Sequence, residues 1–224
     1  MDIAHPSSND PHADQPVMQA GAALEQASAA MVMLHGRGAR ASDILALSSE
    51  LSRPEFSYLA PVAAGNTWYP FSFLEPTRRN EPWLSSALAA VDRVIRHVET
   101  TGIAAEKIIL LGFSQGACLA LEYAARNARR FGGLVGLSGG LIGTEDELHP
   151  HPGSLDETPI FLGCSQVDPH IPAVRVQQSA QILTQMGGDV TARLYPLLGH
   201  EVNQDEIDFV RKMMENLEDR YKNT

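Results

Sequence analysis

The stretch Lys107-Ile-Ile-Leu-Leu-Gly-Phe-Ser-Gln-Gly116 runs from an apolar segment directly into the pattern Gly-x-Ser-x-Gly, with Ser114 at its centre. Strong helix formers follow at once, from Ala117 to Ala125. A strand, a tight turn and a helix form the context in which a serine hydroxyl is exposed at the edge of a sheet, and the helix N-terminus favours developing negative charge. The stretch therefore predicts an α/β fold in which Ser114 is a candidate nucleophile.

A second stretch, Gly136-Leu-Ser138-Gly-Gly140, satisfies the same pattern. It continues into Leu-Ile-Gly-Thr-Glu-Asp-Glu-Leu-His-Pro150, which has glycine and proline where the motif requires a helix. We therefore assign Ser138 to a loop after a strand and retain it as the less favoured alternative. The simpler reading of Ser114, an exposed serine in an ordinary turn, also stays open at this point.

From residue 30 onward, short apolar runs alternate with segments of helical periodicity. This alternation is typical of an α/β fold with a mostly parallel central sheet flanked by helices on both faces. The expected strands are 30–35, 56–61, 107–113, 133–137, 159–164 and 190–195, and the expected helices are 42–52, 84–98, 115–128, 173–186 and 203–219. No internal repeat or Gly/Ser linker interrupts the pattern, so we expect a single domain over residues 16–224.

Charge and composition narrow the class of protein. The net charge of −10 argues against nucleic acid and anionic membranes as partners. Two cysteines fit a reducing compartment, and neither a secretory signal nor an apolar run of roughly 20 residues is visible, so we expect a cytoplasmic protein without integral membrane association. Residues 1–15 are polar and rich in proline and aspartate, and we expect them to form a disordered tail.

A nucleophilic serine needs a neighbouring base, and that base needs an acid to orient it. After an elbow of this type, the acid and then the histidine are expected on loops that follow later strands. Asp168 follows the expected strand 159–164, and His200 follows the expected strand 190–195. The alternatives are that Asp168 belongs to an ordinary Asp-Pro turn and that His200 is a surface histidine. Asp156 and Glu157 precede their strand, at the opposite end of the sheet.

Two further stretches complete the candidate site. In Leu34-His-Gly-Arg-Gly38, the turn after the first expected strand can present the Arg37 amide as an oxyanion donor, alongside the Gln115 amide next to the nucleophile. A simple glycine-flanked turn is the alternative. In Asn66-Thr-Trp-Tyr-Pro-Phe-Ser-Phe-Leu-Glu75, aromatic rings gather on a long connection. We expect Trp68, Tyr69 and Phe71 to form an apolar substrate-binding wall, unless the loop merely packs over the sheet.

Taken together, these stretches resemble the phospholipase/carboxylesterase family of α/β-hydrolases, which includes bacterial carboxylesterases and acyl-protein thioesterases. The blocks that carry the resemblance are Leu34-His-Gly-Arg-Gly38, Gly112-Phe-Ser-Gln-Gly116, Asp168-Pro-His-Ile-Pro172 and Gly199-His200. The resemblance covers residues 30–205 and implies an α/β-hydrolase fold. It also implies Ser114 as nucleophile, Asp168 as acid, His200 as base, and the amides of Arg37 and Gln115 as oxyanion donors.

Two departures from the family pattern indicate to which branch of the family this chain is more similar. The thioesterase branch usually has His-Gly where this chain has Cys164-Ser165, and leucine where it has Arg37. Both departures favour a bacterial carboxylesterase-like branch over a dedicated protein depalmitoylase. The expected activity is hydrolysis of short- or medium-chain carboxylic esters by a serine nucleophile through an acyl-enzyme. Lysophospholipids and thioesters are further possible substrates.

Two alternatives are retained: an acyl-protein thioesterase, and a non-catalytic ligand-binding protein with the same fold. No cofactor is implied. We expect no metal site, because His149 and His151 lack cysteine or carboxylate ligands at fixed spacing, and we read Cys118 as buried packing. The sequence leaves the oligomeric state open. It also leaves open whether the long connections 62–80 and 139–158 move on binding.

Overall fold

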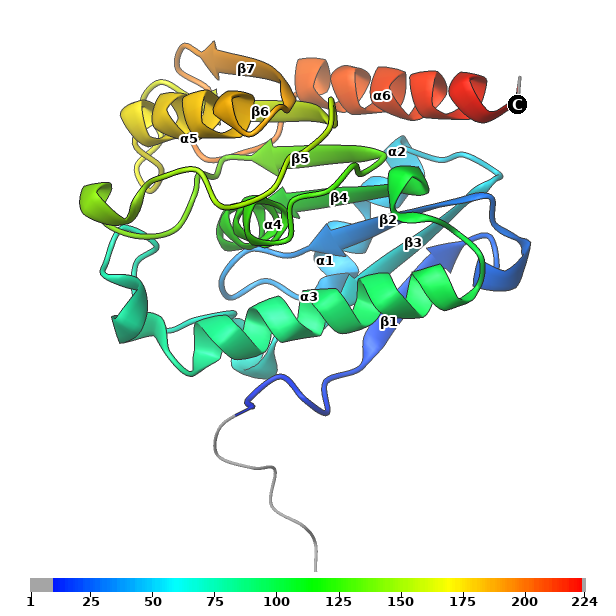
Figure 1. Ribbon diagram of the computed structural model, residues 1–224, viewed down its shortest axis with the longest axis horizontal. Coiled ribbons are helices and arrows are strands. Elements are labelled where there is room, and N and C mark those ends of the chain that lie inside the picture. Colours follow the sequence, from blue (N-terminus) through cyan, green and yellow to red (C-terminus); the bar gives the residue numbers. More distant parts are fainter. Residues whose placement is uncertain (1–9, 223–224) are drawn as a thin grey trace, which may run out of the picture.

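The computed structural model describes residues 10–222 and has a central sheet of seven strands in the order β1-β3-β2-β4-β5-β6-β7 (Figure 1). The strands are β1 Val17–Gly21, β2 Ala29–Leu34, β3 Phe56–Pro61, β4 Ile108–Phe113, β5 Gly133–Leu137, β6 Pro159–Ser165 and β7 Asp189–Tyr195. β1 pairs with β3 in antiparallel register, and all the other pairings are parallel. The carboxyl ends of β2, β4, β6 and β7 therefore lie at one edge of the sheet.

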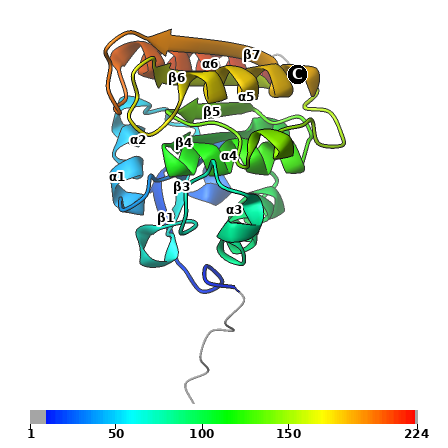
Figure 2. The same cartoon turned by 90° about the vertical axis from the view of Figure 1, so that its left-hand side faces the viewer.

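Helices cover both faces of this sheet, and each face has its own apolar cluster. The helices are α1 Ala41–Leu45, α2 Leu47–Glu50, α3 Trp83–Thr100, α4 Gln115–Arg126, α5 Ala173–Gln185 and α6 Gln204–Lys222. Short 3₁₀ turns lie at Leu24–Gln26, Ala64–Asn66, Thr77–Asn80, Ala105–Lys107 and Glu145–Glu147. Figure 2 shows α1 and α2 on one side of the sheet and α3 and α4 on the other. Residues of α5 belong to the same apolar cluster as those of α3 and α4, while α6 shares its cluster with α1.

The expected α/β fold, mostly parallel with helices on both faces, is confirmed, and the expected strands agree with the observed ones to within one or two residues. β1 was not expected, because its side chains are mostly exposed and show no apolar alternation. The expected helix 42–52 is divided at Ala46 into α1 and α2. Within residues 10–222, no helix is both long and apolar enough to cross a membrane.

The N-terminal segment differs from the expected disordered tail wherever it is described. Residues 1–9 lie outside the described residues, but His12 is only 1% exposed. Its Nε2–H donates to the Trp68 carbonyl over 2.9 Å, and its Nδ1 accepts the Ala64 N–H over 3.0 Å. The ring also packs against Trp68 and Trp83, with centroids 5.5 and 5.4 Å away. Composition did not reveal this docking, because a polar histidine supplies the buried surface.

These contacts require a neutral ring, since a protonated His12 would point an N–H at the Ala64 N–H. Burial lowers the pKa of His12, with Arg93 and His35 contributing in the same direction, against the opposing effects of the Trp68 carbonyl and Asp10. The unfolded chain therefore binds the proton more tightly than the folded chain. It follows that the contribution of His12 to the free energy of unfolding is lost as the pH falls below the ordinary histidine pKa of about 6.5.

We predict that His12→Gln lowers the free energy of unfolding at neutral pH by about 1–3 kcal/mol, because buried hydrogen bonds and ring packing are lost. The variant should also lose less stability than the wild type between about pH 7 and pH 5, because glutamine does not titrate. Urea unfolding at several pH values measures both effects. His97→Gln, which changes an exposed histidine of α3, is the control. Equal pH slopes for the wild type and His12→Gln would contradict the prediction.

Candidate active site

The turn between β4 and α4 holds Ser114 in the left-handed region, at φ 55°. A Cβ on Gly112 would overlap the Gly116 carbonyl, and a Cβ on Gly116 would overlap the Leu34 carbonyl at the end of β2. Both glycines of the motif are therefore needed for α4 to start so close to two strands. The strained serine between them is half-buried, and its side chain lies in a cleft at the carboxyl edge of the sheet.

Ser114, His200 and Asp168, separated by many residues in the sequence, form one hydrogen-bonded chain. The Ser114 Oγ lies 2.9 Å from His200 Nε2, and His200 Nδ1 lies 2.7 Å from Asp168 Oδ2. Because the Asp168 carboxylate can only accept, His200 Nδ1 is the donor to it, which leaves Nε2 to accept the Ser114 proton. This is the geometry that a general base and its orienting acid require.

Asp168 is held as a buried, ionised acceptor, and its side chain has no exposed surface. Burial alone would raise the pKa of Asp168. Hydrogen bonds from His200 and from the amides of His170 and Ile171 outweigh that effect and hold the pKa below its usual value. The Cys164 thiol lies 3.8 Å from Asp168 Oδ2. Burial, together with this carboxylate, raises the pKa of Cys164 to about 12, so that the thiol stays protonated beside the acid.

Ser165 ties the loop that carries the acid to the loop that carries the base. Its buried Oγ accepts the N–H of Val167, directly before Asp168, and the N–H of Gly199, directly before His200, each over 3.2 Å. The sequence analysis noted Ser165 as a departure from a family pattern and did not predict this role. No local signal reveals it, because the two loops meet only in the folded chain.

Arg37 and Gln115, the two expected oxyanion donors, both line the cleft that contains Ser114. Gln115 begins α4, so its amide belongs to the N-terminal N–H groups that have no acceptor within the helix. The turn after β2 passes so close that a Cβ on Gly36 would lie 3.4 Å from the Ser114 Cβ, which brings the Arg37 backbone to the same place. The Arg37 guanidinium donates to the carbonyls of Pro70 and Phe71, both over 2.7 Å. It thereby fixes this turn against the aromatic stretch.

The cleft around Ser114 has a volume of about 490 Å³, within the usual range for small-molecule sites. The residues that line it are Gly36, Arg37, Ala39, Tyr69, Pro70, Phe71, Ser72, Phe73, Phe113, Ser114, Gln115, Cys118, His170, Ile171 and His200. Tyr69 and Phe71 thus lie where a substrate-binding wall was expected. Trp68 does not: it is fully buried, is not part of the lining, and donates its indole N–H to the His35 carbonyl over 2.9 Å. Trp68 therefore supports the wall from behind.

The Gln115 side chain has a second function that the sequence analysis missed. Its Oε1 accepts the Trp68 N–H over 2.9 Å, and its Nε2 donates to the Tyr69 carbonyl over 2.8 Å. The residue after the candidate nucleophile therefore fixes the backbone of the aromatic stretch. The motif itself gives no indication of this, because its x positions accept many residues.

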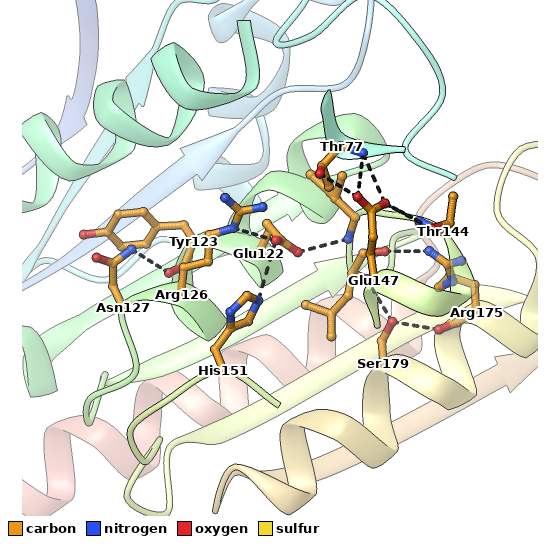
Figure 3. A network of polar contacts seen from close by, with 12 residues as sticks. Thr77, Glu122, Tyr123, Arg126, Asn127, Thr144, Glu147, His151, Arg175 and Ser179 are labelled. Carbon is orange, nitrogen blue, oxygen red and sulfur yellow. Dashed lines mark hydrogen bonds and ion pairs between the residues drawn. The ribbon is translucent and has the colours of Figure 1, made fainter. Parts of the chain in front are cut away.

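The two long connections, 62–80 and 139–158, are bound to each other and to the helices beneath them (Figure 3). Glu147 accepts hydrogen bonds from the backbone and side chain of both Thr77 and Thr144. Burial alone would raise the pKa of Glu147, but these hydrogen bonds outweigh it and lower the pKa to about 2. Arg175 of α5 donates to the Leu141 and Gly143 carbonyls over 3.0 and 2.7 Å. This network fixes the two connections against each other and against α5.

A buried carboxylate of α4, Glu122, anchors the same connection from below. It accepts the Ile142 N–H over 3.1 Å and pairs with Arg126 over 2.7 Å, while His151 lies 3.8 Å away (Figure 3). Ser138, the alternative nucleophile, also has positive φ at 51°. It is fully buried, however, and is not among the residues that line the cleft. A substrate carbonyl in the cleft therefore meets Ser114 and not Ser138.

The sequence of the chain is similar to that of known proteins over most of its length. The sequence model of the phospholipase/carboxylesterase family matches residues 15–218. Acyl-protein thioesterase 1 of Gibberella zeae is 33% identical over 121 residues, which cover 51% of this chain and 51% of that protein. The chain thus aligns with about half the length of this curated relative.

Solved structures of related proteins match this chain over a larger part of its length. The phospholipase/carboxylesterase from Dyadobacter fermentans is 43% identical, with a TM-score of 0.87, and the match covers 90% of this chain and 97% of that one. Zea mays acyl-protein thioesterase 2 has a TM-score of 0.69 and covers 90% of this chain and 98% of its own. At 20% identity, this second match shows the fold alone.

We predict that Asp168→Asn lowers kcat by up to about 10⁴-fold while KM changes little, because an amide favours the wrong tautomer of His200. Steady-state kinetics and an unfolding midpoint, measured on the same variant, separate this effect from loss of fold. Asp156→Asn, an exposed position beyond the opposite end of β6, is the matched control and should retain normal turnover. Near-normal turnover with reduced stability in Asp168→Asn would reduce Asp168 to a turn-capping residue.

Proposed function

Because the chain belongs to the phospholipase/carboxylesterase family, we propose that it is a serine hydrolase that cleaves short- and medium-chain carboxylic esters through an acyl-enzyme. The observation that carries the proposal is the hydrogen-bonded chain from Asp168 through His200 to Ser114, at the wall of an open cleft. Thioesters and lysophospholipids contain a carbonyl of the same kind and are further substrates for the same chemistry.

In the acylation step, Ser114, His200 and Asp168 each have one role. As the Ser114 oxygen bonds to the substrate carbonyl carbon, its proton passes to His200 Nε2. The carbonyl oxygen becomes an oxyanion, which the amides of Arg37 and Gln115 stabilise together with the N-terminus of α4. The bond to the leaving alcohol or thiol then breaks, and His200 returns the proton to that group.

Deacylation repeats the sequence with water in place of the serine. Water gives a proton to His200 as its oxygen attacks the acyl carbon. The second tetrahedral intermediate then collapses: the bond from the acyl carbon to the Ser114 oxygen breaks, His200 returns the proton to that oxygen, and a carboxylic acid leaves. The ionised Asp168 stabilises the imidazolium in both steps. The hydrogen bonds that hold Asp168 below its usual pKa support this assignment, because a protonated acid could not stabilise that cation.

An acyl-protein thioesterase is the second candidate, and the curated relatives named acyl-protein thioesterase 1 favour it. The reaction would be the same, with a lipidated protein as substrate. Cys164-Ser165 and Arg37, the departures from the thioesterase pattern, favour the small-ester assignment. The pocket also favours it, since Tyr69, Cys118 and Arg37 place polar groups along the cleft.

We predict that Ser114→Ala abolishes ester hydrolysis and covalent labelling by a fluorophosphonate, because both reactions need this hydroxyl. Ser138→Ala, which changes the second Gly-x-Ser-x-Gly match, should retain most of both. Hydrolysis of 4-nitrophenyl butyrate and the mass of the labelled protein provide the measurements. Loss of labelling in Ser138→Ala with normal labelling in Ser114→Ala would reverse the assignment. A wild-type protein that neither labels nor hydrolyses would support the non-catalytic alternative.

Acyl length separates the two enzyme candidates. We predict that kcat/KM for thioesters of one common thiol is higher with butyryl and hexanoyl groups than with palmitoyl, because the cleft of about 490 Å³ is lined in part by polar groups. Ser114→Ala supplies the background rate for each substrate. A preference for palmitoyl would favour the acyl-protein thioesterase instead.

A further inference from the structure

The hydroxyl of Tyr69 is buried, and the polar group beside it is the Cys118 thiol, which is only a weak hydrogen-bond acceptor. No stronger partner for this hydroxyl is found among the described residues. The whole residue is 1% exposed, yet it lines the cleft beside Ser114, as does Cys118. Buried hydroxyl groups are nearly always hydrogen-bonded, because leaving one unpaired costs free energy. At the wall of a cleft, an atom of a bound ligand can supply the stronger partner.

Tyr69 cannot readily turn away to satisfy its hydroxyl elsewhere. Gln115 binds the Trp68 N–H and the Tyr69 carbonyl, and the Trp68 indole is itself bound to the His35 carbonyl. The backbone on both sides of the ring is therefore held by hydrogen bonds. This rigidity is the arrangement that a preorganised recognition group needs.

The groups around the hydroxyl favour an acceptor as its partner. Burial raises the pKa of Tyr69 well above its ordinary value, and burial raises that of Cys118 to about 12, so both side chains keep their protons. The Arg37 guanidinium lies 6.0 Å from the centre of the Tyr69 ring. None of the described residues that line the cleft is an aspartate or glutamate, in a chain with a net charge of −10. Two donors and a cation without a lining carboxylate suit an oxygen acceptor.

The position of Tyr69 indicates which part of an ester it meets. His200 must return a proton to the leaving group, so the alcohol or thiol lies on the side of the His200 ring. The His200 ring packs against Phe113 and His170, whereas the Tyr69 hydroxyl lies against Cys118, one turn into α4. We therefore assign the acyl group to the side of Tyr69.

We propose that Tyr69 determines acyl specificity, by donating a hydrogen bond to an oxygen acceptor carried on the acyl chain of the substrate. The preferred substrates are then esters of keto, hydroxy or carboxy acids, and not esters of plain alkanoic acids of equal length. This inference rests on the proposed function, because it places the acyl group in the cleft beside Ser114.

The test compares ethyl hexanoate with ethyl 3-oxo-, 4-oxo- and 5-oxohexanoate in a pH-stat, using the wild type and Tyr69→Phe. Each ester is compared with itself in the two proteins, so intrinsic differences in ester reactivity cancel. Tyr123→Phe removes a buried hydroxyl that is bound to Asp92 and does not line the cleft, and it is the matched control. A thermal melt checks that each variant folds. Tyr69→Phe should fold, since the hydroxyl it removes contacts only the weakly polar Cys118 thiol.

For at least one oxo ester, we expect Tyr69→Phe to lower kcat/KM about five- to tenfold more than it does for ethyl hexanoate. A factor of this size corresponds to the loss of one neutral hydrogen bond. Tyr123→Phe should leave the ratios between esters at their wild-type values. An equal factor for all four esters in Tyr69→Phe would overturn the inference. So would a wild type that cleaves none of them while Ser114 is still labelled by a fluorophosphonate, a result that leaves the proposed function standing. Absence of labelling would overturn the proposed function itself.

Discussion

The close approach of α4 to β2 and β4 is the constraint on which the rest of the site depends. Without side chains at positions 112 and 116, the helix starts against the Leu34 carbonyl, and Ser114 is forced into a left-handed conformation. The same contact brings the Arg37 turn and the first amide of α4 beside the serine oxygen. The proposed nucleophile and the proposed oxyanion donors thus follow from one packing requirement between backbones.

Hydrogen bonds to loop backbone, more than side-chain packing, hold the remaining parts in place. Ser165 connects the loops of Asp168 and His200, Arg37 binds two carbonyls of the aromatic stretch, and Glu147 joins the two long connections. Each of these groups binds backbone atoms of a loop and so fixes the path of the chain there, and not only the position of one side chain. We therefore expect the cleft to be largely formed before a substrate enters.

Sequence reasoning succeeded where a single local rule decides the structure. Buried parallel strands and amphipathic helices have clear patterns, and the elbow glycines with Asp168 and His200 follow from strand order. It missed β1, whose exposed residues carry no period, and it assigned Trp68 to the cleft because an aromatic ring fits a core as well as a pocket. It also missed His12, Ser165 and the Gln115 side chain. Their partners lie far along the chain and meet only through tertiary packing.

The two functions of Gln115 limit how this scaffold can diversify. Its backbone amide is the proposed oxyanion donor and its side chain holds Trp68 and Tyr69, so a substitution there would disturb turnover and substrate choice together. Lineages that acquire new substrates would therefore change Phe71, Phe73 or Ile171, which line the cleft without being bound to the elbow. Directed-evolution libraries on this chain should randomise those three positions and leave residue 115 unchanged.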